Sequence, residues 1–193
     1  MSAPGIAYRL LGGAAAAESE SDLLALAAEA GDGTTARGDT VVRGDTADPA
    51  AARQARVRRR QPGFALVEAR HGGYLVGYGT GLPLRPSTSW WRGLTTPLPE
   101  TVTAEHPGRT FALTELAVRA SWRRQGIGRE LHDLLLDGRT EERATLTVAP
   151  GAGAAQRALR SWGWQKVART RGDAPAAPVL DVLLLSLQSG RGR

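Results

Sequence analysis

The stretch SWRRQGIGRELHDLL, Ser121 to Leu135, constrains the fold more than any other part of the sequence. Its apolar residues from Ile127 onwards recur at the spacing of a helix with one apolar face, and Gly138 follows as a stop. Just upstream, RTFALTELAV, Arg109 to Val118, is rich in β-branched and apolar residues and contains no breaker. The sequence therefore predicts a strand, then a glycine-rich turn, then a helix that begins near Gly126.

A glycine-rich turn at the start of a helix has a known physical use. A helix begins with unpaired N–H groups and the positive end of its dipole, and glycines without Cβ let an anion approach the backbone. Arg123, Arg124 and Arg129 add positive charge at the same place. We therefore predict a site for a phosphorylated ligand. The alternative is an ordinary strand-to-helix turn in which Gly126 and Gly128 serve only geometry.

Composition excludes several classes of function. The 193 residues suit one domain, or one domain plus a flexible segment. Without cysteine there is no disulfide framework, thiolate nucleophile or cysteine-based zinc site. No membrane span or signal peptide is evident, so we expect a cytoplasmic protein. The net charge is +6, but the arginines are scattered. Their one cluster, RVRRR at Arg56 to Arg60, ends a predicted helix and is typical of a solvated face, so nucleic-acid binding is not favoured.

The rest of the chain alternates between strand and helix signals. Strands are expected at 5–11, 63–70, 73–82, 143–150, 164–170 and 178–187, and helices at 19–31, 48–59 and 153–164. We predict an α/β fold with a mixed sheet, in one domain over 1–188, in the order β-α-α-β-β-β-α-β-α-β-β. A flexible loop at 31–48 and a disordered tail at 189–193 are also expected. The long loop at 83–108 contains Trp90 and Trp91, which favour an ordered, functional segment.

This order of elements, with the residues Arg123-x-x-Gly126-x-Gly128, resembles the GNAT family of acyl-CoA-dependent N-acyltransferases. TELAVRASWRRQGIGRELHDLL is similar to that family's strand, pyrophosphate loop and helix, and AAQRALRSWGW resembles its second signature helix. Two linked motifs are more specific than one. The resemblance implies a central mixed β-sheet flanked by helices, N-acetyltransferase activity with acetyl-CoA as cosubstrate, and no metal.

The resemblance also implies which residues bind acetyl-CoA. Backbone N–H groups of the loop would hold the pyrophosphate, and the preceding strand would offer backbone hydrogen bonds to the pantetheine arm, as in strand addition. The residues so implied are Arg123, Arg124, Gln125, Gly126, Ile127, Gly128 and Arg129 in the loop, and Leu116, Ala117 and Val118 in the strand.

The sequence departs from the family at one position that matters for catalysis. The family commonly has a tyrosine in the second motif helix as proton donor to the leaving thiolate, and here that position is Leu159. A thiolate, whose thiol has a pKa of about 8.5, can leave without an acid. An alkylamine with a pKa of about 10.4 is mostly protonated at pH 7, so the protein needs a carboxylate near the acceptor.

Glu115 is the candidate for this carboxylate, either to steer a cationic amine or to take its proton through water. The alternative for Glu115 is a strand-surface carboxylate paired with an arginine. Tyr78 is a candidate replacement for the missing donor, with packing in the core as the alternative.

We expect direct transfer of the acetyl group to a small-molecule amine, cationic and with an apolar or sugar-like body, held by Trp90 and Trp91. Protein amines are an alternative acceptor. A CoA-binding regulatory or interaction module without catalysis is an alternative function, which Leu159 motivates. A homodimer is left open.

Overall fold

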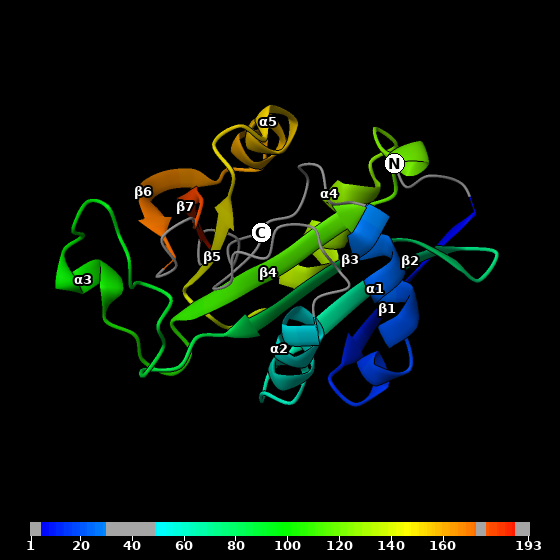
Figure 1. Cartoon of the computed structure of the whole chain (residues 1–193), viewed down its shortest axis with the longest axis horizontal. Coiled ribbons are helices and arrows are strands. Elements are labelled where there is room, and N and C mark those ends of the chain that lie inside the picture. Colours follow the sequence, from blue (N-terminus) through cyan, green and yellow to red (C-terminus); the bar gives the residue numbers. More distant parts are fainter. Residues whose placement is uncertain (1–4, 30–48, 173–176, 188–193) are drawn as a thin grey trace. The chain divides into compact units, whose positions relative to one another are not determined.

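The computed structural model describes residues 5–29, 49–172 and 177–187. Its strands are β1 (Ile6–Gly12), β2 (Ala65–His71), β3 (Tyr74–Pro83), β4 (Thr110–Val118), β5 (Arg143–Val148), β6 (Gln165–Arg171) and β7 (Val179–Ser186). Its helices are α1 (Glu20–Glu29), α2 (Pro49–Arg59), α3 (Glu100–Thr103), α4 (Ile127–Leu136) and α5 (Gly153–Ser161). The strands form one sheet in the order β1-β2-β3-β4-β5-β7-β6 (Figure 1). Because β4 and β5 are parallel, whereas the pairs β1–β2, β2–β3, β5–β7 and β6–β7 are antiparallel, the sheet is mixed.

The predicted fold class and order of elements are confirmed. Each expected strand and helix occurs, with its ends moved by a few residues, and the short helix α3 is an addition within the long loop at 83–108. The loop predicted at 31–48 and the tail predicted at 189–193 lie outside the described residues. In the described part of the chain, no helix is both long enough and apolar enough to cross a membrane.

The described residues group into two compact units. The first contains residues 5–29, 49–82 and 115–138, and the second contains residues 83–114, 139–172 and 177–187. Strand β4 contributes residues 110–114 to the second unit and residues 115–118 to the first. That the two units form one domain over 1–188 stays a prediction.

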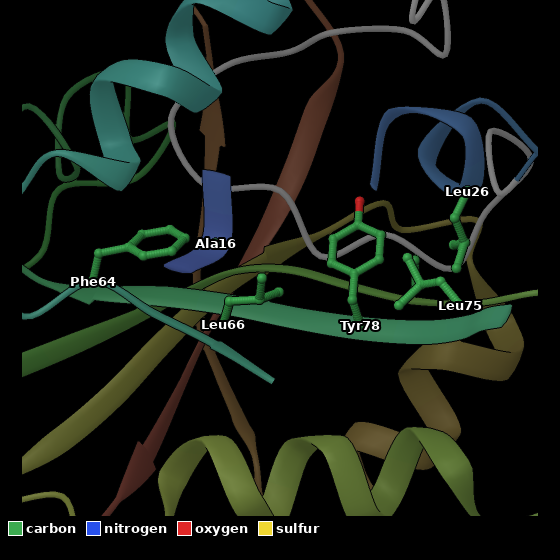
Figure 2. Close-up of a cluster of buried hydrophobic side chains, with 7 residues drawn as sticks. Ala16, Leu26, Phe64, Leu66, Leu75 and Tyr78 are labelled. Atoms are coloured by element: carbon green, nitrogen blue, oxygen red, sulfur yellow. The ribbon is translucent and has the colours of Figure 1, made fainter. Parts of the chain in front are cut away.

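An apolar cluster on one face of the strands holds the first unit together. Leu66 of β2 and Leu75 and Tyr78 of β3 pack there with Ala16 and Leu26 (Figure 2). Helices α1 and α2 lie on this face of the strands, and α4 lies on the opposite face. The Tyr78 ring is therefore buried, and its hydroxyl is the end farthest from the sheet.

Helix α4 can approach the sheet closely because β3 carries glycines beneath it. A Cβ on Gly77 would lie 3.0 Å from both the Ala117 carbonyl oxygen and Leu131 Cδ1. A Cβ on Gly79 would lie 3.3 Å from Leu116 Cδ1. Carbon atoms pack best at about 3.5–4.0 Å, so a side chain at Gly77 would push the helix outward. The glycines thus fix the position of the helix that follows the predicted anion loop.

A buried carboxylate ties β1, β2 and α1 together. The Glu68 side chain is fully buried and accepts hydrogen bonds from Arg9 at 3.0 Å and Arg70 at 2.9 Å. Arg70 also donates to Asp22 of α1 at 2.8 Å. Burial by itself raises the pKa of Glu68, but the hydrogen bonds from Arg70, Ser19 and Arg9 outweigh it and lower the pKa to about 2. The ionised carboxylate therefore stabilises the first unit.

In the second unit, β5 lies between β4 and β7. The parallel ladder with β4 runs from the pair Thr110–Arg143 to the pair Ala112–Thr145. Strand β7 pairs antiparallel with both β5 and β6. On β7, Asp181 is bonded by Lys166 at 2.6 Å and Arg169 at 3.0 Å, which satisfies a charge in an otherwise apolar strand.

Candidate active site

The turn from β4 into α4 adopts a backbone conformation that few side chains tolerate. After a short 3-10 helix at Ala120–Trp122, Arg124 has φ +66° and Gly126 has φ +83°. Glycine reaches this left-handed region freely, whereas an arginine there costs roughly 1–2 kcal/mol. Strain of this kind is retained where the surrounding structure imposes it, and it clusters at ligand sites.

The N-terminus of α4 is open to an anion. No side chain caps it, and the Gly126 carbonyl oxygen accepts the first helical bonds, from the N–H groups of Arg129 at 3.0 Å and Glu130 at 3.1 Å. A Cβ on Gly128 would contact only Val118 Cγ2, at 3.7 Å. Internal packing therefore does not require this glycine, and its missing side chain leaves the first turn accessible. These features fit a pyrophosphate.

The predicted arginines of the loop differ in what they contact. Arg123 Nε donates to the Val118 carbonyl oxygen at 3.1 Å, which ties the loop back to the end of β4. Arg129 pairs with Asp133 at 2.6 Å, one turn along the helix. Arg124 is exposed. Arg123 therefore ties the loop to the end of the strand that is predicted to bind the pantetheine arm, and the Val118 carbonyl oxygen accepts this hydrogen bond.

A residue that the sequence analysis missed, Arg119, anchors the start of the loop. Its backbone N–H donates to the Val76 carbonyl oxygen at 2.9 Å, and its Nε donates to the Leu75 carbonyl oxygen at 2.7 Å. The guanidinium lies 4.3 Å from the centre of the Tyr74 ring and pairs with Glu29. Neither the spacing of the motif nor its composition distinguishes Arg119 from the neighbouring arginines.

The end of β4 presents one carboxylate between buried apolar residues. Leu116, Ala117 and Val118 are buried, and the Glu115 side chain is 27% exposed. Residues 115–118 of β4 belong to the first unit. The backbone hydrogen bonds to a ligand that the sequence predicts for residues 116–118 stay a prediction.

The two predicted catalytic residues, Glu115 and Tyr78, lie in hydrogen-bond contact. The Tyr78 hydroxyl donates to Glu115 Oε2 at 2.8 Å. Arg58 of α2 adds a third member, with Nη1 at 4.0 Å from Glu115 Oε1. The interpretation of residues 56–60 as a solvated face is wrong for Arg58 and Arg59, whose side chains are 17% and 9% exposed.

The two tryptophans of the long loop have partners inside the second unit. Trp90 is buried, packs with Leu84 and Ala112, and donates from Nε1 to Thr145 Oγ1 at 3.2 Å. Trp91 donates from Nε1 to Glu105 at 2.9 Å. These contacts hold the loop within the second unit. Binding of an acceptor by Trp90 and Trp91 stays a prediction.

Solved structures share this fold at low sequence identity. A GNAT-family protein from Desulfovibrio desulfuricans is 17% identical with a TM-score of 0.58, over 94% of this chain and 99% of that one. The protein yncA of Salmonella typhimurium, solved with acetyl-CoA, is 16% identical with a TM-score of 0.57, over 94% of each chain. The ribosomal-protein-alanine N-acetyltransferase of Brucella melitensis is 21% identical with a TM-score of 0.57, over 93% of this chain and 99% of that one. No curated protein sequence matches the chain significantly.

The fold and the loop define an acyl-CoA-dependent transferase, and the sequence agrees with this class. Residues 35–164 match the model of the acetyltransferase (GNAT) family, which is more than half of the chain. The chain belongs to this family. It is an acyltransferase, and the cosubstrate of its family is acetyl-CoA.

Proposed function

We propose that this acetyltransferase transfers the acetyl group of acetyl-CoA directly to the nitrogen of a small-molecule amine. The turn from β4 into α4 carries the proposal, because it combines left-handed backbone at Arg124 and Gly126 with an uncapped helix start. Acetyl-CoA supplies an acetyl thioester. Backbone N–H groups of residues 124–129 would hold its pyrophosphate, and the dipole of α4 would favour the negative charge.

Glu115 is the residue that would receive the amine. Bringing an alkylamine to its neutral form at pH 7 costs roughly 4 kcal/mol, so a carboxylate at the acceptor favours both binding of the cation and removal of its proton. The hydroxyl of Tyr78 donates to Glu115, so we assign Tyr78 to positioning this carboxylate. The amine nitrogen forms its bond to the acetyl carbon as the bond to sulfur breaks, the thiolate keeps the electron pair, and the amine proton passes to Glu115 or to water.

Leu159 bears on the rate of the reaction. Its side chain is buried in α5 at 3% exposure and has no proton to give. Without a positioned acid the thiolate leaves unaided, which forgoes about 10²–10⁴-fold in rate. Since the thiol has a pKa of about 8.5, turnover without an acid is chemically reasonable. A slow acetyltransferase is thus the expectation.

Protein amines remain an alternative class of acceptor. Two structural neighbours are ribosomal-protein-alanine N-acetyltransferases, from Brucella melitensis and Escherichia coli, at 21% and 14% identity. At such identities the likeness concerns the fold. A cytoplasmic location, in keeping with the absence of cysteine, and a homodimer stay predictions.

The first test is a calorimetric titration of acetyl-CoA into the protein. Binding at micromolar concentrations should be lost in Gly128→Asp, because the new carboxylate would occupy and repel the pyrophosphate site. The matched control is Gly151→Asp, since a Cβ there meets nothing within 4 Å and the residue lies outside the loop. Equal binding by both variants would refute the assignment of the loop.

The second test is a screen of amines for thiol release from acetyl-CoA. Turnover on small amines supports the proposal, and turnover confined to peptides supports protein acceptors. Binding of acetyl-CoA without turnover on either class supports a binding module instead. For Glu115→Gln, we expect an altered pH–rate profile, and an unchanged profile would refute the role of Glu115.

A further inference from the structure

Arg58 places a positive charge beside the carboxylate that is proposed to receive the amine. Its Nη1 lies 4.0 Å from Glu115 Oε1, while Tyr78 occupies Glu115 Oε2 at 2.8 Å. The side chains of Arg58 and Glu115 are 17% and 27% exposed, so both are partly accessible to solvent. An acceptor that contacts Glu115 therefore meets a guanidinium within a few ångströms.

The neighbouring cations of α2 are paired with a carboxylate of α1. On the same helix, Arg56 and Arg59 share one carboxylate, Glu20 of α1, at 2.7 Å and 3.1 Å. The sequence of α2, PAAARQARVRR, contains no acidic residue. Glu115 thus lies beside a cation, and an acceptor carrying only positive charge would be repelled by Arg58 as it is attracted by Glu115.

We propose that the acceptor is a free amino acid or a close analogue, whose amino group binds Glu115 and whose carboxylate binds Arg58. A guanidinium is a planar donor that matches a carboxylate with two parallel hydrogen bonds. A zwitterion carries one positive group to pair with Glu115 and one negative group to pair with Arg58. Both residues therefore keep a counter-charge when the ligand displaces water from them. This inference rests on the proposed function and replaces the expected cationic acceptor by a zwitterionic one.

The test compares amino acids with their carboxamides as acceptors, because the amide lacks the carboxylate. The α-amine of the amide is also less basic, with a pKa of about 8, so rates are expressed per neutral amine for both. A panel pairs acidic, basic, aliphatic and aromatic amino acids with the corresponding amides, and kcat/KM is measured for each at saturating acetyl-CoA. We expect an acid-to-amide ratio of roughly 10 to 100 in at least one pair, the range for a hydrogen bond to a charged group. In Arg58→Gln this ratio should fall towards one.

The ratio is informative because a general loss of activity in Arg58→Gln affects both members of a pair equally. Arg56→Gln is the matched control, since Arg56 is 63% exposed and bonded to Glu20, and there the ratio should persist. Arg58→Lys keeps the positive charge but replaces the planar guanidinium by a single ammonium group. A ratio in Arg58→Lys between those of Arg58→Gln and the unaltered protein would support a contact based on charge.

Three outcomes would overturn the inference. The first is a ratio of one or less in every pair for the unaltered protein. The second is a ratio that Arg58→Gln leaves unchanged. The third is a protein that binds acetyl-CoA normally but acetylates only peptides, or only amines that lack a carboxylate. Failure to bind acetyl-CoA at all is distinct from these, because it refutes the proposed function itself.

Discussion

Replacing Glu68 with glutamine should lower the free energy of unfolding by about 3 kcal/mol at pH 7. The pKa of this carboxyl falls from 4.5 to about 2 on folding, although burial alone would raise it, because Arg70, Ser19 and Arg9 donate to its ionised form. At 1.36 kcal/mol per unit, that shift corresponds to about 3 kcal/mol. The Glu68 side chain is fully buried and that of Arg70 is 17% exposed, so solvent screens this pair little, whereas Arg9 is 58% exposed and contributes less.

The sign of the effect fixes its dependence on pH. The folded-state pKa of Glu68 lies below the unfolded value, so its contribution is complete above pH 4.5 and is lost as the pH falls towards about 2. The difference between the unaltered protein and Glu68→Gln should therefore be constant near neutrality and shrink below pH 4.5. Urea unfolding curves at stepped pH values measure it.

A matched control and a refuting result are both available. Glu142→Gln removes a carboxylate that is 45% exposed and 3.6 Å from His106, and should change the free energy of unfolding by less than about 1 kcal/mol. If the effect of Glu68→Gln stayed constant from neutral pH down to about pH 3, the ionised carboxylate would not be what stabilises the first unit.

Three further substitutions test the site and its support. Tyr78→Phe removes the hydrogen bond to Glu115 but keeps the ring, so kcat should fall, while acetyl-CoA affinity measured by calorimetry is retained. Gly128→Val should weaken acetyl-CoA binding at least about tenfold with little change in the melting temperature, since its Cβ has room within the fold. Gly77→Val should lower the melting temperature by several degrees, for a loss of roughly 2 kcal/mol, because its Cβ would lie 3.0 Å from Leu131.

Much of the fold was predictable because local signals mark where its elements end. Gly126 and Gly138, with φ of +83° and +66°, flank α4 as the sequence indicated, and Gly163, with φ +93°, follows α5. These positions need left-handed backbone, which glycine provides at no steric cost. The cofactor loop was predictable for the same reason, since its chemistry lies in consecutive residues.

The acceptor side was harder to predict because its residues come from separate elements. Tyr78 and Glu115 were each candidates, but their contact depends on how β3 and β4 are placed, which neither segment reveals. Arg58 was missed because helical spacing does not say which arginine at a helix end points inward. The pair Trp90–Trp91 signalled an ordered loop, yet adjacency could not show that both indole N–H groups have partners in the second unit.

The left-handed backbone at Arg124 has a consequence for the thermodynamics of ligand binding. The left-handed φ of Arg124, +66°, is part of the folded structure, so its strain of roughly 1–2 kcal/mol lowers folding stability. A preorganised loop has little entropy left to lose when a ligand arrives, which favours affinity without any induced movement. Arg124→Gly should relax this strain and stabilise the fold. The folded enzyme would have a higher free energy of unfolding, and its loop would be more flexible and carry less positive charge.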